Sequence, residues 1–327
     1  MIAPPLLVSY SSLNEYLEAL GPELSYQYKT EITQLFEKRL PIVVSFRCLS
    51  VLFGFSTNFV YKLAQQNWKF YRTFTIRKGK KKRTIQAPKV ALKVIQKWFG
   101  YHLSEVLSFD KYVHGFVPGR SAIGAANVHT NARWVYSVDI ENFFPTTTKK
   151  VIKESLISIG YSFEAADLIA NICCYKDTLA QGAPSSPVIS NLVLKELDKQ
   201  LKTIADSNQI RFTRYADDIV FSGIDKFPTE IKDQISDLFK ETCWKLSPEK
   251  EYLAESPMRL KVHGFLVHGE KARLTKGYRN RIRAYKHLLN AGKIRNEDLG
   301  RIVGHVKYAE SVIKAQKPGL CPDSAHS

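Results

Sequence analysis

Two adjacent carboxylates interrupt a pair of short β-prone runs in the second half of the chain. Residues 211–223 read RFTRYADDIVFSG, with apolar and β-branched residues on both sides of Asp217 and Asp218. This pattern predicts a β-hairpin with the acidic pair at its turn. Buried neighbouring carboxylates repel each other, so such a turn is costly unless a cation neutralises it. An ordinary Asp-rich turn explains the YADD letters equally well.

A third carboxylate, Asp139, ends another β-prone run. Residues 132–140 read ARWVYSVDI, whose side chains alternate toward a core, and Pro145 stops the run. If the two runs form neighbouring strands, Asp139, Asp217 and Asp218 converge on one sheet edge. Three such carboxylates suit two Mg²⁺ ions about 3.5 to 4 Å apart, because oxygen-only ligands favour Mg²⁺ over zinc. The arrangement predicts nucleotidyl transfer.

The formal charge of +17 is concentrated in two stretches. Between Lys69 and Lys97 there are eleven Lys/Arg and no Asp/Glu, and between Glu270 and Lys317 thirteen Lys/Arg stand against four Asp/Glu. One basic run alone can be a solvated face or a solubility feature. Two runs that flank a neutral middle favour a nucleic acid gripped from both sides. Aromatic residues that can stack on bases lie within or beside both stretches: Trp68, Phe70, Tyr71, Phe74, Tyr278 and Tyr285.

Hydrophobic spacing predicts short elements in the first half of the chain. We expect two or three helices over 10–65, broken by Gly21-Pro22 and Pro41, and then a basic hairpin over 70–87 with Gly79 at its tip. The next segment predicts a helix with its apolar face on Val90, Val94, Trp98 and Leu103.

Further elements follow the Asp139 run. We expect one helical stretch over 148–172, then a strong helix opened by the loop QGAPSSP, with Ile189, Val193, Leu197 and Leu201 on one face. After the acidic hairpin we expect a helix from Glu230 to about Trp244, two strands (KEYLAE and RLKVHGFLVH), and a basic helical segment to about Gln316. Together these elements predict a mixed sheet of the split βαβ type, backed by helices.

Several classes of protein are disfavoured. No run of about 18 apolar residues is present, and the first residues lack the basic lead and apolar stretch of a secretory signal. The five cysteines are odd in number and include no C-x-x-C pair, which disfavours a zinc site and a disulfide framework. We therefore expect a cytoplasmic protein with reduced thiols and no membrane contact.

The order of four motifs resembles a known family. VDIENFFP, QGAPSSP, YADD and KVHGFL stand in the order and approximate spacing of the palm motifs of reverse transcriptases, most similar to the bacterial retron enzymes, from about Arg72 to Lys317. The resemblance implies an α+β right-hand polymerase with fingers, a palm with a ferredoxin-like split βαβ sheet, and a helical thumb. It implies N-terminal helices and fingers over 1–130, a palm over 131–268 with 148–185 contributing to the fingers, and a basic thumb with a loose tail over 269–327.

The same resemblance implies catalytic roles. Asp139, Asp217 and Asp218 would be ligands of two Mg²⁺ ions, with the backbone carbonyl of Ile140 as an extra ligand. Lys250 lies where the family often has a lysine that protonates pyrophosphate, although a surface lysine fits the sequence equally well.

Other positions resemble the family's nucleotide-binding residues. Phe144 falls at the steric gate that rejects a ribose 2′-OH, with the alternative that Phe143 and Phe144 are core residues. Gln181 and Gly182 open the nucleotide-binding loop, which also reads as a helix-capping turn. Lys82 and Arg83 resemble the residues that hold the incoming triphosphate, but neighbouring lysines are equally placed.

Residues 262–265 resemble the turn that grips the primer, with Gly264 allowing close backbone approach. Two positions depart from the usual retron pattern: Ala125 replaces Asn in the Asn-Ala-x-x-His motif that ends at His129, and His263 replaces Thr in Val-Thr-Gly. The candidate primer or RNA contacts are His129, Val262, His263, Gly264, Phe265, Arg279 and Arg283.

The resemblance implies an enzyme that copies a cognate structured non-coding RNA into branched, RNA-linked single-stranded DNA from deoxynucleoside triphosphates. It also implies a role in antiphage defence with a separate effector protein. Two alternatives remain: a reverse transcriptase of another bacterial lineage, such as an intron-encoded or diversity-generating type, and a catalytically inert RNA-binding protein on the same scaffold.

Overall fold

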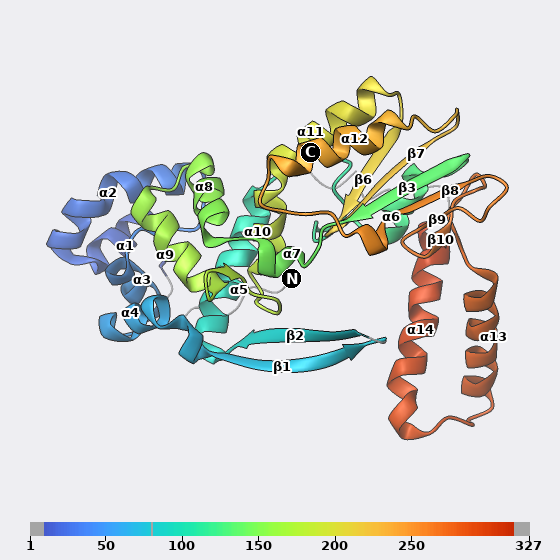
Figure 1. The fold of residues 1–327 in the computed structure, drawn as a ribbon. Helices are drawn as coiled ribbons and strands as arrows, with labels where there is room; N and C mark the ends of the chain where they lie inside the picture. Colours follow the sequence, from blue (N-terminus) through green and yellow to red (C-terminus); the bar gives the residue numbers. More distant parts are fainter. Residues whose placement is uncertain (1–9, 80, 317–327) are drawn as a thin grey trace. The chain divides into compact units, whose positions relative to one another are not determined.

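The structure is a computed structural model that describes residues 10–79 and 81–316. The chain divides into two compact units, whose elements are labelled in Figure 1. Unit 1 contains Met1–Asp110, Ile140–Leu197 and Phe239–Lys245, and unit 2 contains Lys111–Asp139, Asp198–Leu238 and Leu246–Ser327. Each unit is therefore assembled from segments that are distant in the sequence.

Four helices open unit 1, where spacing predicted two or three: α1 (Leu13–Ala19), α2 (Gly21–Glu37), α3 (Phe46–Phe53) and α4 (Thr57–Gln65). Serine residues at the N-caps of α3 and α4 account for the additional helix. The side chains of Ser45 and Ser56 accept hydrogen bonds from the backbone N–H groups of Cys48 and Phe59, at the first turns of α3 and α4. Gly54, with φ 63°, ends α3 in the left-handed conformation that glycine adopts readily.

The basic hairpin is confirmed. After the short 3₁₀ turn η1 (Asn67–Phe70), strands β1 (Tyr71–Lys78) and β2 (Lys81–Pro88) pair antiparallel, and Gly79 turns the chain at their tip with φ 64°. The following helix α5 (Val90–Val106) is also confirmed, and its predicted apolar face is confirmed in part. Trp98 and Leu103 are buried as predicted, together with Leu92, Ile95 and Phe99, whereas Val90 is 80% exposed.

The helix predicted over 148–172 is two helices. α8 (Lys149–Ile159) ends at Gly160, whose φ of 118° is accessible to glycine, and α9 (Phe163–Cys173) restarts with Ser162 as its cap. Short strands β4 (Cys174–Tyr175) and β5 (Thr178–Leu179) follow. The helix predicted after QGAPSSP is likewise interrupted, at Leu194, between α10 (Ser186–Val193) and α11 (Lys195–Ser207).

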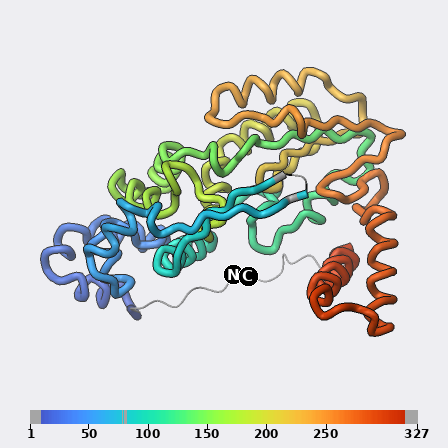
Figure 2. Tube along the Cα trace, turned by 60° about the horizontal axis from the view of Figure 1, so that its bottom comes forward, coloured from blue at the N-terminus to red at the C-terminus, as the bar shows by residue number. Residues whose placement is uncertain are grey.

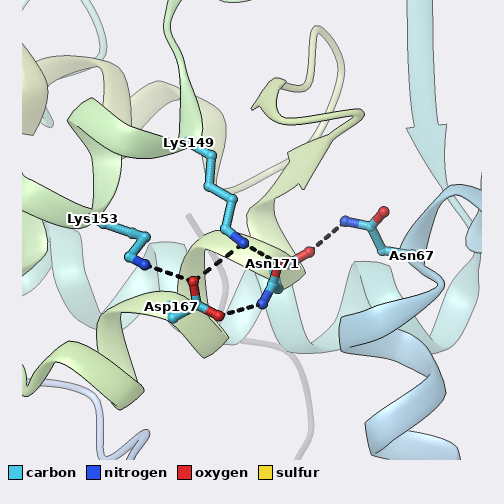
Figure 3. Close-up of polar contacts among 5 residues, drawn as sticks. All are labelled: Asn67, Lys149, Lys153, Asp167 and Asn171. Carbon is cyan, nitrogen blue, oxygen red and sulfur yellow. Dashed lines mark hydrogen bonds and ion pairs between the residues drawn. The ribbon is translucent and has the colours of Figure 1, made fainter.

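A polar network joins α8 and α9 to the base of the hairpin (Figure 3). Asp167 accepts hydrogen bonds from Lys153 at 2.8 Å and from Asn171 at 2.7 Å, and it lies 3.2 Å from the Lys149 ammonium. Asn67 donates to the backbone carbonyl of Asn171. Because Asp167 is shared by two lysines, its carboxylate fixes the angle between the two helices, and Asn67 ties η1 to them.

The sheet of unit 2 has the predicted split βαβ topology, but all its strand pairs are antiparallel, so the prediction of a mixed sheet is wrong. Its antiparallel strand order is β6-β7-β3-β8. Within this sheet, β3 comes first in the sequence and pairs with β7 and β8, the third and fourth strands. Helices connect β3 to β6 and β7 to β8. The strands and the second connecting helix are β3 (Trp134–Asp139), β6 (Arg211–Tyr215), β7 (Asp218–Gly223), α12 (Glu230–Lys240) and β8 (Tyr252–Glu255).

Side-chain alternation gives this sheet two different faces. On one face, Phe227 packs edge-on against Trp134, with ring centroids 4.9 Å apart, near the start of α12. On the other face, Val135 and Val220 form a core with Ile123 of α6 (Ala122–Val128). Because Asp139 and Asp218 are an even number of residues from Val135 and Val220, they lie on the α6 face.

The first face also holds a fully buried ion pair. Arg214 of β6 and Asp198 of α11 are joined by two hydrogen bonds of 2.6 Å, and their side chains are 0% and 3% exposed. A third bond of 3.0 Å runs from the Arg214 guanidinium to the backbone carbonyl of Ala216. Arg214 therefore connects a covering helix, a strand and the acidic turn.

The C-terminal part of unit 2 differs from the prediction in detail. The run predicted as one strand bends at His263-Gly264 into β9 (Lys261–Val262) and β10 (Phe265–Leu266). Strand β10 pairs with β9 on one side and with β11 (Arg273–Leu274) on the other. The basic segment is two antiparallel helices, α13 (Lys276–Asn290) and α14 (Asn296–Ala315), which lie side by side in Figures 1 and 2. Figure 2 views them from a second direction.

Two other predictions concern the end of α12 and membrane-spanning helices. The helix expected to reach about Trp244 ends at Lys240. Within residues 10–79 and 81–316, no helix combines the length and apolarity needed to cross a membrane. The tail predicted beyond Pro318 lies outside the described residues.

The Arg214–Asp198 pair predicts a large stability effect. We expect Arg214→Met to lower the free energy of unfolding by roughly 3 to 5 kcal/mol, because it removes the guanidinium that pairs with the buried Asp198 carboxylate. Urea unfolding followed by circular dichroism measures the change. The double variant Arg214→Met/Asp198→Leu removes both charges and should recover most of the loss. A single variant as stable as the wild type would contradict the structural role of the pair.

Candidate active site

Strand pairing brings two of the predicted carboxylates together. In the β3–β7 ladder Asp139 is directly opposite Asp218, and in the β6–β7 ladder Asp218 is opposite Tyr215. The turn between β6 and β7 is therefore Ala216-Asp217, with Asp217 beside the opposed pair. This register places the three aspartates in one region of the sheet.

The acidic turn is held in an unusual backbone conformation. Ala216 has φ 57°, a left-handed value that costs a residue with a Cβ atom roughly 1 kcal/mol or more. The Arg214 bond to the Ala216 carbonyl compensates from inside the sheet. On the other side, Gly115 packs so closely that a Cβ atom there would lie 2.1 Å from the Ala216 nitrogen. Gly115 is thus required to be glycine, a constraint that the sequence alone did not show.

The opposed carboxyls titrate as a pair. Asp139 is only 5% exposed, and this burial, together with repulsion from Asp217 and the bond to Asp218, raises its pKa to about 7. Burial also pushes the pKa of Asp218 up, but the interactions of its carboxylate with His263 and Asp139 outweigh this and lower the pKa. Close packing of like charges in a partly buried place is unfavourable, and a bound cation would relieve it.

The chemistry of these donors fits a divalent cation, because three carboxylates supply oxygen ligands and net negative charge. As the side chains stand, no three His, Cys, Asp or Glu residues in the described part of the chain are gathered into a closed metal site. The carboxylates are near one another through strand register and turn position, so a metal would need side-chain rotation to be enclosed. Ile140, the predicted backbone ligand, is fully buried and follows Asp139 directly.

Lys250 lies at the aspartates and is not a remote surface residue. It ends the 3₁₀ turn η2 (Pro248–Lys250), its ammonium donates a hydrogen bond to Asp139, and its side chain remains 46% exposed. Burial lowers the pKa of Lys250, but the Asp139 bond and the nearby Asp217 and Asp218 charges raise it overall. The backbone N–H of Ser247 also donates to the Asp139 carbonyl at 2.8 Å, which anchors the segment. A protonated amine is therefore maintained beside the carboxylates.

Residues after Asp139 turn into the short helix α7 (Phe143–Thr146) of unit 1 through Asn142, whose φ is 47°. Phe143 is buried and its ring centroid lies 6.2 Å from that of Trp244, whereas Phe144 is only partly buried. The two phenylalanines thus divide as one core residue and one residue with accessible surface. Phe144 is the one that the steric-gate prediction names.

The predicted nucleotide loop pairs with the basic hairpin inside unit 1. The backbone N–H of Gln181 donates to the side chain of Gln86 at 2.8 Å, and the Gln86 N–H donates to the Gln181 carbonyl at 2.9 Å. Gly182 has φ 125°, and a Cβ atom there would lie 2.8 Å from the Ile85 side chain. Gln86 thus anchors the loop to β2, the strand that carries exposed Lys82 and half-exposed Arg83. No sequence signal marked Gln86.

The predicted primer turn presents its backbone and one side chain. Val262 and Phe265 pair across β9 and β10 and are buried in the core formed with α6, while Gly264 is exposed. The His263 side chain is 7% exposed and points its Nδ1 atom toward Asp218, 3.7 Å from Oδ2. Arg279 and Arg283 are exposed and lie four residues apart, on one face of α13.

His129 has no exposed surface. Both ring nitrogens are engaged within the sheet core, Nδ1 with the Ser222 hydroxyl and Nε2 with the Thr213 hydroxyl, each at 2.7 Å. These bonds account for His129 as a structural residue that ties the end of α6 to β6 and β7. Because His129 has no accessible atom, the structure does not support its predicted contact with RNA.

Burial, with nearby His263 and Arg211, lowers the pKa of His129 from 6.5 to about 3. A histidine with a depressed pKa in the folded state stabilises the fold only above its unfolded pKa. We therefore expect the free energy of unfolding to fall as the pH drops from about 6.5 toward 3, by as much as a few kcal/mol from this group.

Denaturant unfolding at several pH values would test this prediction, with His129→Gln as the matched variant. Gln can still donate and accept hydrogen bonds, and it does not titrate. The stability of the variant should depend less steeply on pH over the same interval. Parallel curves for the two proteins would contradict the assignment.

The comparison with known families covers this region of the chain. Residues 76–267 match the family model for reverse transcriptase (RNA-dependent DNA polymerase). This match includes Asp139, Asp217, Asp218 and the loop opened by Gln181.

Several curated retron proteins are similar over most of their length. The Retron Ec86 reverse transcriptase of Escherichia coli is 30% identical over 246 residues, 74% of this chain and 76% of that protein. The Retron Mx65 reverse transcriptase of Myxococcus xanthus is 28% identical over 290 residues, 83% of this chain and 67% of that protein. The Retron Ec73 reverse transcriptase of Escherichia coli is 30% identical over 252 residues, 70% of this chain and 79% of that protein.

Solved structures include telomerase from Candida albicans with a fragment of telomeric RNA, at TM-score 0.44 and 11% identity, covering 81% of this chain and 61% of that one. Apo telomerase from Candida tropicalis gives TM-score 0.46 and 11% identity, covering 76% and 58%. The chain thus spans about three fifths of these telomerases, which are too distant to add to the assignment. The family match and the retron relatives decide it: this α+β chain has the right-hand polymerase fold and belongs to the reverse transcriptase family, among the bacterial retron reverse transcriptases.

Proposed function

We propose that this enzyme copies a cognate structured non-coding RNA into branched, RNA-linked single-stranded DNA, with two Mg²⁺ ions held by Asp139, Asp217 and Asp218 and by the carbonyl of Ile140. The observation that carries the proposal is the register of β3 and β7, which sets Asp139 opposite Asp218 beside the acidic turn. Divalent ions held by these residues would lower the pKa of the attacking hydroxyl and neutralise charge on the triphosphate.

The protein's own groups prepare this chemistry. The raised pKa of Asp139 reflects negative charge gathered in a partly buried place, which favours a cation over a proton as pH increases. Lys250 keeps a protonated amine beside Asp139, a position suited to protonating the leaving pyrophosphate. Arg214 and Gly115 hold the backbone of the acidic turn, so that the carboxylates are oriented before substrate binds.

For the incoming deoxynucleotide we retain the roles that family resemblance implies. Lys82 and Arg83 would hold the triphosphate, and Gln181 and Gly182 would form the nucleotide-binding loop. Two observations support this grouping: all four belong to one paired strand and loop within unit 1, and Gln86 fixes that pairing. Phe144 would exclude the ribose 2′-OH, since its ring is the partly exposed member of the Phe143-Phe144 pair.

For RNA and primer we assign the backbone of the turn formed by Val262, His263, Gly264 and Phe265, together with the exposed arginines of α13. Arg279 and Arg283 repeat with one helical turn, as expected for guanidiniums that follow a phosphate backbone. From the family resemblance of the sequence we also propose a role in antiphage defence with a separate effector protein, in the cytoplasm. The division into fingers, palm and thumb that the family resemblance implies remains a prediction.

The catalytic proposal can be tested by removing one of the metal ligands. We expect Asp218→Asn to reduce Mg²⁺-dependent deoxynucleotide incorporation on an RNA template by more than roughly 100-fold, because even residues that only support metal ligands cost 10- to 100-fold. Glu255, an exposed carboxylate at the end of β8, supplies a matched control, and Glu255→Gln should retain activity. Wild-type activity in Asp218→Asn would refute the assigned site, and an inactive wild type would favour the inert RNA-binding alternative.

The product decides between reverse transcriptase lineages. Nucleic acid that copurifies with the protein should contain DNA joined to RNA through a 2′,5′ branch that a debranching enzyme cleaves. Unbranched DNA primed from a 3′ end would instead support an intron-encoded or diversity-generating lineage.

Sugar selection tests Phe144. We expect Phe144→Ala to lower the preference for deoxynucleotides over ribonucleotides by roughly 100-fold, because the ring that blocks the 2′-OH is removed. The ratio of kcat/KM for the two substrates measures the preference. Phe143→Leu, a change in the neighbouring core residue, should reduce stability and leave the ratio near that of the wild type. An unchanged ratio in Phe144→Ala would remove Phe144 from the gate.

A further inference from the structure

The turn that carries His263 has a restricted backbone. His263 and Gly264 connect β9 to β10 and have φ values of 48° and 85°, so both central residues of this two-residue turn are left-handed. Glycine, asparagine and aspartate occupy such positions readily, whereas histidine does so less often. The flanking Val262 and Phe265 are buried in the core with α6. The turn is therefore fixed at its base, and the direction of the His263 side chain is set by the backbone.

That direction is inward, toward the aspartates. The ring is 7% exposed and its Nδ1 lies 3.7 Å from Oδ2 of Asp218. On the same side the ring packs against Tyr215, with centroids 5.2 Å apart and planes inclined by 48°. Tyr215 is the strand partner of Asp218 in the β6–β7 ladder. His263 thus contacts both members of one cross-strand pair at the acidic hairpin.

The two ring nitrogens have different environments. Nε2 is buried and has no hydrogen-bond partner among the described residues, whereas Nδ1 faces a carboxylate. In a neutral imidazole only one nitrogen carries hydrogen, and a carboxylate accepts but does not donate. The Nδ1–H tautomer is therefore favoured. At 3.7 Å the contact is longer than an ordinary hydrogen bond, and a small rotation of either side chain closes it.

We propose that His263 is a positioning residue: through Nδ1 it orients the Asp218 carboxylate for metal binding and ties that carboxylate to the β9–β10 turn. This inference rests on the proposed function, because it takes Asp218 as a metal ligand. Residues that support metal ligands in this way commonly fix the ligand's rotamer and charge. The exposed backbone of Gly264 lies on the same turn, so a primer strand seated against it would bear on the orientation of Asp218.

The alternative is that His263 contacts RNA directly. A side chain that is only 7% exposed offers little surface for stacking or for a phosphate, and its Nδ1 atom already faces the Asp218 carboxylate. The buried Nε2 has no route to an external acceptor without movement of the turn. The positioning role uses the side chain as it lies.

Substitutions that tolerate a left-handed backbone separate the two roles. Asparagine places its amide nitrogen at the same branch position as the histidine Nδ1 and can donate to Asp218. Glycine accepts the same backbone conformation and supplies no donor. His263→Asn and His263→Gly are therefore matched in backbone strain and differ in the proposed interaction. His268→Asn, a change of an exposed histidine in the same segment, is the control.

The primary measurement is Mn²⁺ binding to the full chain without template or nucleotide, followed by electron paramagnetic resonance. We expect His263→Gly to weaken Mn²⁺ binding by roughly 10-fold or more, and His263→Asn to remain within about 3-fold of the wild type. The Mg²⁺ concentration for half-maximal incorporation should shift in the same order. Template-primer affinity should stay within about 2-fold for all variants, and His268→Asn should match the wild type throughout.

Two outcomes would overturn the inference. If template-primer affinity falls while Mn²⁺ binding is unchanged, His263 contacts nucleic acid and does not position Asp218. If folded His263→Asn and His263→Gly lose Mn²⁺ binding equally, the ring acts only through packing. Asp218→Asn in the same assay distinguishes this from the larger proposal: wild-type Mn²⁺ binding by that variant would remove Asp218 from the metal site, whatever the His263 variants show.

Discussion

The buried pair of Arg214 and Asp198 is the interaction on which the active-site sheet depends. Arg214 has no exposed surface, so its charge is tolerable only because Asp198 pairs with it through two short bonds. The same guanidinium bonds to the carbonyl of Ala216, whose left-handed backbone would otherwise be unfavourable. One side chain thus secures a helix, a strand and the turn that carries Asp217. Fold stability and the placement of the carboxylates have a common origin.

Strand alternation separates the requirements of stability from those of chemistry. One face of the sheet is covered by α11 and α12 and holds Arg214, Trp134 and Phe227. The opposite face carries the Asp139 and Asp218 pair at one end and a hydrophobic core with α6 farther along. Because neighbouring side chains point to opposite faces, the acids can be gathered without placing charge in the main core. A register shift of one residue would destroy both faces together.

Local sequence patterns predicted the elements that depend on interactions between residues close together in the sequence. The acidic hairpin, the Asp139 strand, the basic hairpin with Gly79 and the split βαβ order all follow from alternation and turn residues. Contacts between distant segments were not readable: Gly115 against Ala216, and Gln86 against Gln181, arise only after folding. The exposure of Val90 on α5 shows the same limit, because apolar residues recur around this helix and packing decides which of them are buried.

Each of the opposed carboxylates has its own nitrogen neighbour, Lys250 at Asp139 and His263 at Asp218. Both neighbours come from segments that follow the sheet's central strands in the chain. Without them, three crowded carboxylates would oppose folding of the hairpin. With them, the acidic pair holds its charge beside a protonated amine and an imidazole before any cation arrives.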